Sequence, residues 1–507
     1  MATGLGPPRA ASPSRPAAGR VALTGALAVT LLALAVRLAT ATTQSFWLDE
    51  AYTEHLVHLG LGTMLSEIPR TESTPPLYYL VAWGWTHVFG SGELALRSVS
   101  ALAGTGTVTC AYLLGDRLAG PRAGLIAGGL LSLSPLMVWY SQEARAYALA
   151  AFLATASLLC LIRYLDSRRS AWAAAWATTA ALGLCSHYFV GFVVLPEVAW
   201  LLWRRRAQTE VRVAVGVVVL VAVALLPLAL AQHGTGHADY IAQGSLATRT
   251  LQVPKQFLIG YVSPVQVLTT ALAAVLVLAG SLWPLLRSRA WAATPVRITL
   301  TAGLTGVLVP LLLAPLGFDF VDTRNLLPAL VPLLVVAAVG FASPAARPWG
   351  PWAAGALAAL FAAVVVVVNA DPRYQRSDWG GASSALGPAR VTRVIVVSPG
   401  NGLLPLQAYQ PTIRVLGAPL AVREIDIVSV ALPIEGSGLG PVPPPPPQPQ
   451  IPAGFHPAGT VHSRGYTLLR YRSARPVIVS MPELVPLHPG LTGAILVQSA
   501  GRQSPRP

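Results

Sequence analysis

The sequence predicts a polytopic α-helical membrane protein of about eleven transmembrane helices with a small extracytoplasmic α/β domain at its C-terminal end. Apolar residues make up 54% of the 507 residues and charged residues only 11%, whereas soluble domains contain about 25% charged residues. The mean hydropathy is +0.58. Apolar stretches of about 17–25 residues, the length that crosses a bilayer, recur along the chain.

The first stretch could instead be a signal peptide, because Ala39-Thr40-Ala41 resembles a small-residue cleavage site. Its apolar part is long for a signal peptide, so we expect an uncleaved helix. The expected spans are residues 21–40, 97–116, 122–140, 147–164, 171–187, 189–203, 212–231, 264–286, 298–316, 326–342 and 351–368.

Short clusters of arginine give the orientation of these spans. They fall in alternate connections, at 9–20, 117–122, 163–169, 204–212, 287–297 and Arg347. The positive-inside rule places such clusters in the cytoplasm. The positive-inside pattern of these arginines therefore explains the net charge of +15, and nucleic-acid binding is not expected. The loops 41–96, 141–146, 232–263 and 317–325, the turn near His187 and the C-terminal segment then lie outside.

The chain accordingly divides into four regions. We expect a cytoplasmic tail at 1–20, a membrane domain at 21–368 with its outer loop at 41–96, an extracytoplasmic α/β domain at 369–481 and a loose tail at 482–507. The stretch 75–89 is rich in Trp and Tyr, which favour the headgroup region, so we expect an interfacial helix there. In the α/β domain, strands are expected at 391–398, 412–416, 421–431 and 458–471, with a proline-rich extended connector at 441–453.

Asp49 and Glu50 follow the first span directly, in Phe46-Trp47-Leu48-Asp49-Glu50. Two carboxylates are costly to hold near hydrocarbon, which makes them a functional hypothesis. One of them could accept a proton from a nucleophile at the membrane surface. On a helix they point about 100° apart and cannot share one task. A solvated loop pair is the alternative.

Further motifs follow in a fixed order on the outer side: Pro75-Pro76-Leu77-Tyr78-Tyr79, Leu96-Arg97-Ser98, Ser141-Gln142-Glu143-Ala144-Arg145-Ala146-Tyr147, Arg324-Asn325-Leu326-Leu327-Pro328 and Asp378-Trp379. With the Asp49-Glu50 motif, they make the chain resemble the membrane glycosyltransferases of the GT-C superfamily. The resemblance is to the family 39-like group, which includes protein O-mannosyltransferases, the lipid A aminoarabinose transferase and actinobacterial mannosyltransferase-like proteins. It covers about residues 21–340. Thr74 stands where the family often has His, so that histidine's role is in doubt; Glu72 and His87 are the candidates to replace it.

The resemblance implies an enzyme of the cell membrane that moves a sugar, mannose first among the candidates, from a polyprenyl-phosphate donor to an acceptor hydroxyl on the outer face, with inversion. Asp49 is the expected base, and Glu50 orients it, contacts the sugar or binds an ion. The departing phosphate needs cations, for which Arg324, Arg145 and Lys255 are the candidates. The candidates for contacts with the substrate are Glu143, Tyr147, His187 and Tyr188.

Several alternatives stay open at this stage. Arg324 could snorkel at a helix end, Arg145 could pair with Glu143, and His187-Tyr188 could belong to an interfacial belt. Arg37, inside the first span, either snorkels outward or faces a cavity.

Glu143 is the only acid in the second outer loop, so no obligatory metal is expected, although a divalent ion is possible because some superfamily members use one. The acceptor stays open between a glycan, a glycolipid and a protein. A transporter or flippase that breaks no bond is the alternative from another class, and the absence of an internal repeat speaks against it. A catalytically inactive scaffold is a third reading.

Overall fold

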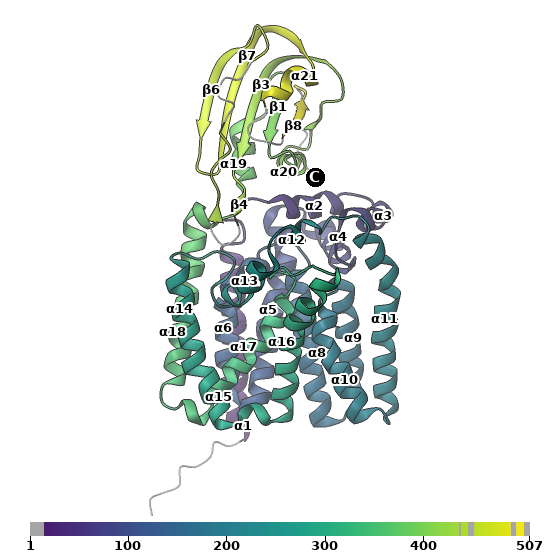
Figure 1. Ribbon diagram of the computed structural model, residues 1–507, viewed down its shortest axis with the longest axis vertical. Coiled ribbons are helices and arrows are strands. Elements are labelled where there is room, and N and C mark those ends of the chain that lie inside the picture. The colour runs from purple at the N-terminus through teal and green to yellow at the C-terminus, as the bar shows by residue number, and fades with distance from the viewer. Residues whose placement is uncertain (1–14, 435–437, 445–450, 488–492, 501–507) are drawn as a thin grey trace, which may run out of the picture.

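The computed structural model describes residues 15–434, 438–444, 451–487 and 493–500. Figure 1 shows a bundle of helices with a sheet domain stacked on one end. We call this the sheet-side end of the bundle. The N-terminal helix α1 begins at Arg15, and the predicted tail before it and the central part of the proline-rich connector, 445–450, lie outside the described residues.

Each of the eleven predicted stretches is helical. They are α1 Arg15–Ala39, α5 Glu93–Ala119, α6 Pro121–Leu133 with α7 Pro135–Ser141, α8 Tyr147–Ser167, α9 Ser170–Ser186, α10 Val190–Arg205, α11 Thr209–His233, α14 Gln266–Val277 with α15 Trp283–Ser288, α16 Thr294–Leu313, α17 Leu327–Ala342 and α18 Gly350–Ala370. Within the described ranges, five helices are long and apolar enough to cross a membrane, and the bent pair α6–α7 makes a sixth.

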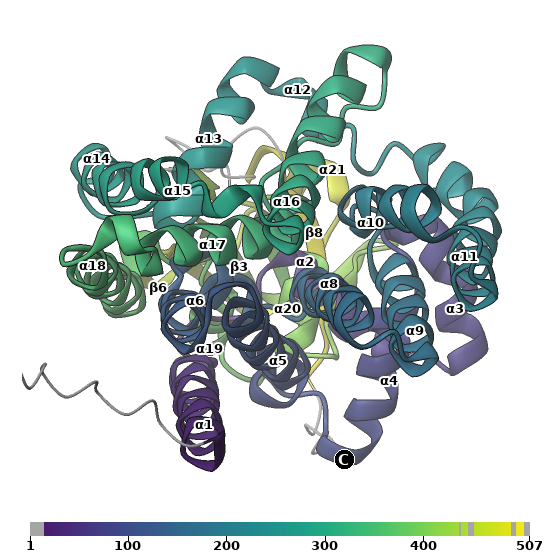
Figure 2. The same cartoon turned by 90° about the horizontal axis from the view of Figure 1, so that it is seen from below.

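Helix α17 lies in the middle of the bundle, as the view along the bundle in Figure 2 shows, and packs against α5, α6, α8 and α16. Its residues are almost all buried, so it has no broad lipid-facing surface. The segment with Arg324 leads directly into this helix. A residue at its start is therefore held by the centre of the bundle.

The bend between α6 and α7 is stabilised by a buried arginine from α1. The two helices meet at 59°, and Pro135 at the start of α7 cannot donate to the carbonyls that end α6. Arg37 supplies the missing donors, with Nη2 to the Leu131 carbonyl and Nη1 to the Ser132 carbonyl, both at 3.3 Å. Arg37 is fully buried in the bundle, so it neither snorkels to the headgroups nor faces open solvent.

The predicted first outer loop, 41–96, forms three short helices across the sheet-side end: α2 Leu48–Val57, α3 Leu61–Thr71 and α4 Leu77–Phe89. The 13 residues of α4 extend about 20 Å, too short for a hydrocarbon core of about 30 Å. Two further short helices, α12 Tyr240–Gln243 and α13 Leu246–Ile259, lie at the same end.

The C-terminal domain is built on a six-stranded mixed sheet in the order β2-β8-β1-β3-β7-β6. Strand β1 is parallel to β3, and the other pairs are antiparallel. Helices α19 Trp379–Leu386 and α20 Leu403–Tyr409 lie between the sheet and the bundle (Figure 1). Its strands are β1 Arg393–Ser398, β2 Arg414–Val415, β3 Leu420–Val430, β6 His456–His462, β7 Tyr466–Val479 and β8 Ala494–Gln498. Each of the predicted strand regions overlaps at least one of them.

The prediction of a loose tail from residue 482 is wrong for Ala494–Gln498, which forms β8 inside the sheet. This strand pairs with β1 on one side and β2 on the other. Leu496 is fully buried, and Gln498 accepts a hydrogen bond from Arg393 Nε at 3.0 Å. Five residues give no clear local signal, because the partner that makes them a strand lies about a hundred residues earlier.

We therefore expect a chain that ends at residue 487 to lose the fold of its C-terminal domain, because β1 would lose one of its two neighbours and its buried Arg393 a partner. Limited proteolysis of the membrane-inserted protein should then cut rapidly between residues 390 and 480. A chain that ends at residue 500 keeps β8 and serves as the control. Equal resistance of the two chains would contradict the placement of β8.

Candidate active site at the sheet-side end of the bundle

Glu50 and Arg97 form a buried ion pair that organises the chain before Asp49. Arg97 Nε and Nη2 donate to the two Glu50 carboxylate oxygens at 2.7 and 2.6 Å, and the Ala144 N–H donates to Glu50 at 2.9 Å. Arg97 also donates to the carbonyls of Ala41, Gln44 and Ser45 at 2.6–2.9 Å. Burial opposes ionisation of Glu50, but the charge and hydrogen bonds of Arg97 outweigh this effect. The pKa of Glu50 is therefore lowered.

Because Glu50 is fully buried and its oxygens are occupied, it has no surface with which to contact a sugar. The geometry fits the first of the predicted roles, in which Glu50 orients Asp49. The two carboxylates stand at the start of α2, where negative charge favours the helix. Glu50 faces Arg97 inside the protein, and the Asp49 side chain points to a different side of the helix.

Asp49 pairs with Arg324 at 3.1 Å, and Arg324 pairs in turn with Asp322 at 3.0 Å. The Asp49 side chain is 25% exposed and Arg324 12%, whereas Glu50 and Arg97 are at most 1% exposed. The guanidinium of Arg324 also lies over the rings of Tyr147 and Tyr240, at 5.9 and 5.7 Å. This pair therefore combines a carboxylate and a guanidinium, 275 residues apart in sequence, at a place that solvent reaches.

Arg145 contacts the same region but pairs with Glu72 at 2.8 Å, so the predicted alternative of an Arg145–Glu143 pair is wrong. Tyr79 donates to Glu72 at 2.6 Å and is linked to Thr74 at 3.1 Å. Glu72 is thus enclosed by its partners. Arg145 Nη1 lies 3.4 Å from the carbonyl oxygen of Asp49, which adds positive charge beside that residue.

Glu143 pairs with Arg376. Arg376 was not among the candidate residues that the sequence predicted. The two paired side chains meet at 2.8 Å and both are buried. Arg376 also lies 4.2 Å from the Trp139 ring and 5.9 Å from that of Trp47. Burial raises the pKa of Glu143 to about 7 against the lowering effect of Arg376, and Glu50 and Asp49 raise it further. An arginine just after the last span, on the side where arginines are rare, was the signal that could have revealed Arg376.

His187 lies against Tyr147, with ring centres 5.6 Å apart, and is buried rather than part of a belt facing the headgroups. Burial lowers its pKa to about 3, with a smaller contribution from the nearby arginines, so the imidazole is neutral at pH 7. Tyr188 points elsewhere and donates to Gln232 at 2.7 Å. The Lys255 ammonium donates to the Tyr261 carbonyl at 3.1 Å, beside a cleft rather than in the Asp49–Arg324 pair.

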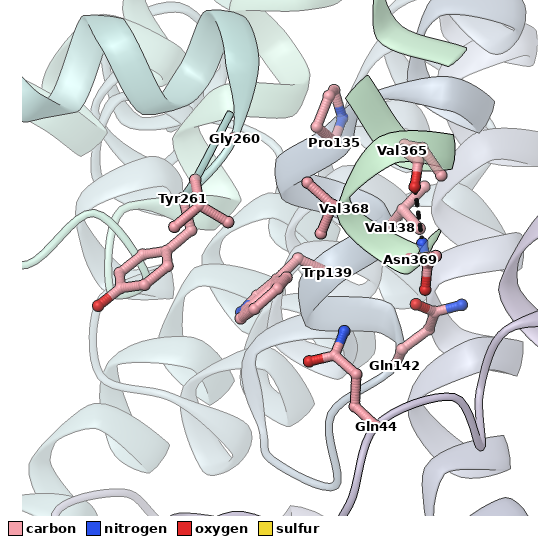
Figure 3. Close-up of a pocket in the computed structure, with 11 residues that line it drawn as sticks. Gln44, Pro135, Val138, Trp139, Gln142, Gly260, Tyr261, Val365, Val368 and Asn369 are labelled. Carbon is pink, nitrogen blue, oxygen red and sulfur yellow. Dashed lines mark hydrogen bonds between the residues drawn. The ribbon is translucent and has the colours of Figure 1, made fainter. Parts of the chain in front are cut away.

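This cleft is drawn in Figure 3. Its walls are apolar, with the rings of Trp139 and Tyr261, and the amides of Gln44, Gln142 and Asn369 lie together at one end. A second, polar cavity of about 170 Å³ shares Gln44 with it and lies between the first outer loop and the C-terminal domain. The cleft of Figure 3 is the smaller of the two, with a volume of about 20 Å³.

Asp49, Asp322 and Glu143 are acids of this region, and each is paired with an arginine. In the part of the chain that the structure describes, no group of three or more His, Cys, Asp or Glu side chains is arranged to hold a metal ion. That no metal is obligatory stays a prediction.

Comparison with known proteins bears on this arrangement. The crystal structure of ArnT from Cupriavidus metallidurans bound to undecaprenyl phosphate is similar over 90% of this chain and 98% of its own, with 13% identity and a TM-score of 0.52. A family model described as dolichyl-phosphate-mannose-protein mannosyltransferase matches residues 73–230. The chain has a GT-C glycosyltransferase fold. The resemblance that the sequence motifs indicated is thereby confirmed, and the described residues include several helices apolar and long enough to cross a membrane.

Two other GT-C structures show weaker likeness. The oligosaccharyltransferase from Archaeoglobus fulgidus, in a complex with Zn and sulfate, has 14% identity and a TM-score of 0.47, covering 76% of this chain and 61% of its own. The arabinosyltransferase EmbB from Mycobacterium smegmatis has 16% identity and a TM-score of 0.40, covering 89% and 48%. No curated protein matches the sequence significantly.

The GT-C bundle brings Asp49, Arg145, Tyr147, His187 and Arg324 into one region at its sheet-side end, through the chain of contacts described above. Glu50 and Glu143 lie directly behind them, each held by an arginine. The structure does not place Lys255 or Tyr188 in this group.

We expect Arg97→Leu to lower the free energy of unfolding by about 3–5 kcal/mol, because it leaves the Glu50 carboxylate buried without its partner. The double variant R97L/E50L should recover part of that loss. Thermal unfolding in detergent measures both. Arg117→Leu breaks the exposed Arg117–Asp166 pair and is the control, with an expected change of about 0–1 kcal/mol. Equal effects of R97L and R117L would contradict the role of Arg97.

Glu143 should make the stability of the protein depend on pH. Its pKa is about 7 in the folded protein against an ordinary value of 4.5, so between these values the folded state binds more protons than the unfolded state. Stability should therefore fall as pH rises from about 4.5 to 7, and this slope should be smaller in Glu143→Gln. Melting temperatures of both proteins across pH 4.5–7.5 test the sign; identical profiles would rule the contribution out.

Proposed function

We propose that this protein is a polyprenyl-phosphate-dependent glycosyltransferase in which Asp49 is the base and Arg324 receives the departing phosphate. The observation that carries the proposal is the solvent-accessible Asp49–Arg324 pair at the end of a GT-C bundle. Support for the donor class comes from ArnT, whose crystal structure holds undecaprenyl phosphate, and from the dolichyl-phosphate-mannose family model. Mannose is the donor sugar we propose first.

The proposed reaction is a single displacement at the anomeric carbon. The acceptor hydroxyl oxygen forms the new bond to that carbon while the bond from carbon to the phosphate oxygen breaks. Asp49 accepts the hydroxyl proton, and the electron pair of the broken bond stays on the phosphate. The guanidinium of Arg324 can donate two parallel hydrogen bonds to phosphate oxygens, which stabilises the charge as it develops.

Inversion requires the base and the phosphate to lie on opposite sides of the sugar. In the structure, Asp49 and Arg324 touch at 3.1 Å, which leaves no space between them. A bound phosphate would compete with Asp49 for Arg324, because both are anions. We therefore propose that donor binding separates the pair and releases the Asp49 carboxylate to act as a base. The Arg145 guanidinium, 3.4 Å from the Asp49 carbonyl, supplies a second positive charge for the phosphate.

We further propose that the eleven apolar helices all cross the membrane and that the site faces the extracytoplasmic side. The arginine clusters in the connections at the opposite end of the bundle support this orientation. The lipid part of the donor would then enter from the outer leaflet, and the acceptor is a glycan, a glycolipid or a protein.

Asp49→Asn keeps the shape of the side chain but removes the base, so we expect sugar transfer to fall by about 10²-fold or more. Purified protein in liposomes with polyprenyl-phosphate-mannose and a mixture of cell-envelope acceptors should release polyprenyl phosphate, and D49N should not. Asp371→Asn, which alters an exposed ion pair with Arg373, is the control and should remain active.

Arg324→Lys should lower both the apparent affinity for the donor and the rate, because a lysine cannot reproduce the two-pronged contact with phosphate. Movement of the donor across the liposome membrane without bond cleavage would contradict the proposal and identify a transporter instead.

A further inference from the structure

The C-terminal domain contacts Gln44, Ser45 and Phe46, which lie just before Asp49 in the chain. The Arg376 backbone N–H donates to the Gln44 side chain at 2.9 Å, and the Ser45 hydroxyl donates to Asp378 at 2.8 Å. The Phe46 backbone N–H donates to the Tyr409 hydroxyl at 2.7 Å. The domain that follows the last membrane helix therefore reaches back over more than 330 residues to the start of α2.

Tyr409 makes the contact nearest to Asp49. It ends α20, which packs against α2 beneath the sheet (Figure 1). Its hydroxyl accepts from the Phe46 N–H and donates to the carboxylate of Glu93 at the start of α5. Its ring also lies 6.3 Å from that of Phe46. One hydroxyl thus joins the C-terminal domain, the first outer loop and a membrane helix.

Residues 44–46, just before Asp49, are consequently held from two sides. Arg97 fixes the carbonyls of Gln44 and Ser45 from the bundle, and Tyr409 fixes the N–H of Phe46 from the C-terminal domain. The remaining contact of that N–H is with Glu93 at 3.3 Å, which is longer. Asp49 lies three residues further on, where a small shift of the backbone moves the carboxylate directly.

We propose that Tyr409 is a positioning residue for Asp49: its hydroxyl sets the start of α2, so that the C-terminal domain holds the base in place for transfer. This inference rests on the proposed function for the role of Asp49. A displacement of about 1 Å in a reacting group can cost about 10²-fold in rate. The effect of losing the hydroxyl should therefore appear in kcat rather than in donor binding, because Tyr409 touches neither Arg324 nor Arg145 in the contacts described.

Tyr409→Phe removes the hydroxyl and keeps the ring. We expect kcat to fall at least tenfold, with KM for polyprenyl-phosphate-mannose within twofold of the wild type. Hydrogen–deuterium exchange of the peptide covering 41–50 should become roughly tenfold faster, because the Phe46 amide loses its shortest bond. Tyr471→Phe makes the same chemical change on β7, on the opposite face of the sheet, and should leave both measurements unchanged.

Glu93 provides an independent test that does not depend on the stability of the Tyr409 variant. Glu93→Gln keeps an acceptor for the Tyr409 hydroxyl and should retain at least half of the wild-type kcat, whereas Glu93→Ala should resemble Tyr409→Phe. The double variant E93A/Y409F should be no slower than the slower single variant, because both changes remove one linkage.

The two proposals fail in different ways. If the wild type transfers sugar and Tyr409→Phe keeps kcat within twofold with unchanged exchange, Tyr409 does not position Asp49 and the inference is overturned. If the wild type transfers no sugar, the proposed function fails, and the exchange rates alone decide whether Tyr409 fixes the start of α2. Unchanged exchange in both Tyr409→Phe and Glu93→Ala would overturn the inference in that case too.

Discussion

The buried ion pair between Arg97 and Glu50 is the interaction on which the site depends. Neither charge could remain at this depth without the other, because an unpaired buried carboxylate or guanidinium is far costlier than a paired one. Arg97 also donates hydrogen bonds to the backbone carbonyls of residues 41, 44 and 45. The pair therefore fixes the path of the main chain as well as the position of the charge. The direction in which the chain runs from α1 into α2, and with it the position of Asp49, follows from this pair.

Several acid–arginine pairs gather at the sheet-side end, and their exposure separates their roles. Glu50–Arg97 and Glu143–Arg376 are at most 2% exposed, whereas Asp49 is 25% exposed. A buried pair with complete hydrogen bonding is suited to hold the backbone. A pair that water reaches can exchange its partner for a substrate anion at a smaller desolvation cost. The adjacent acids Asp49 and Glu50 thus differ in environment: Glu50 is buried against Arg97, whereas Asp49 is partly exposed beside Arg324, as their separation of about 100° on the helix allows.

The sequence predicted the helices because each is an apolar stretch of membrane length, a signal carried by local composition. It also indicated Asp49, Arg145 and Arg324 as candidates, since charged residues beside apolar helices are rare, and the structure brings these three together. The sequence could not predict the pairing of acids with arginines. In the structure, Arg145 forms an ion pair with Glu72, and Arg376 forms one with Glu143. Those choices depend on how distant loops pack, and so does β8, whose five residues become a strand by pairing with β1.

The C-terminal domain holds the chain just before Asp49 from the side opposite the bundle. The segment that carries Asp49 follows α1, and Arg97 holds it from the bundle. Contacts of Arg376, Asp378 and Tyr409 with residues 44–46 join it to a sheet domain that has its own core. Because Arg376 also holds Glu143, the same short segment after the last helix braces both the first and the second outer loop. The backbone before Asp49 is thus fixed by contacts that do not involve Arg324, as the proposed exchange of Arg324 from Asp49 to the donor phosphate requires.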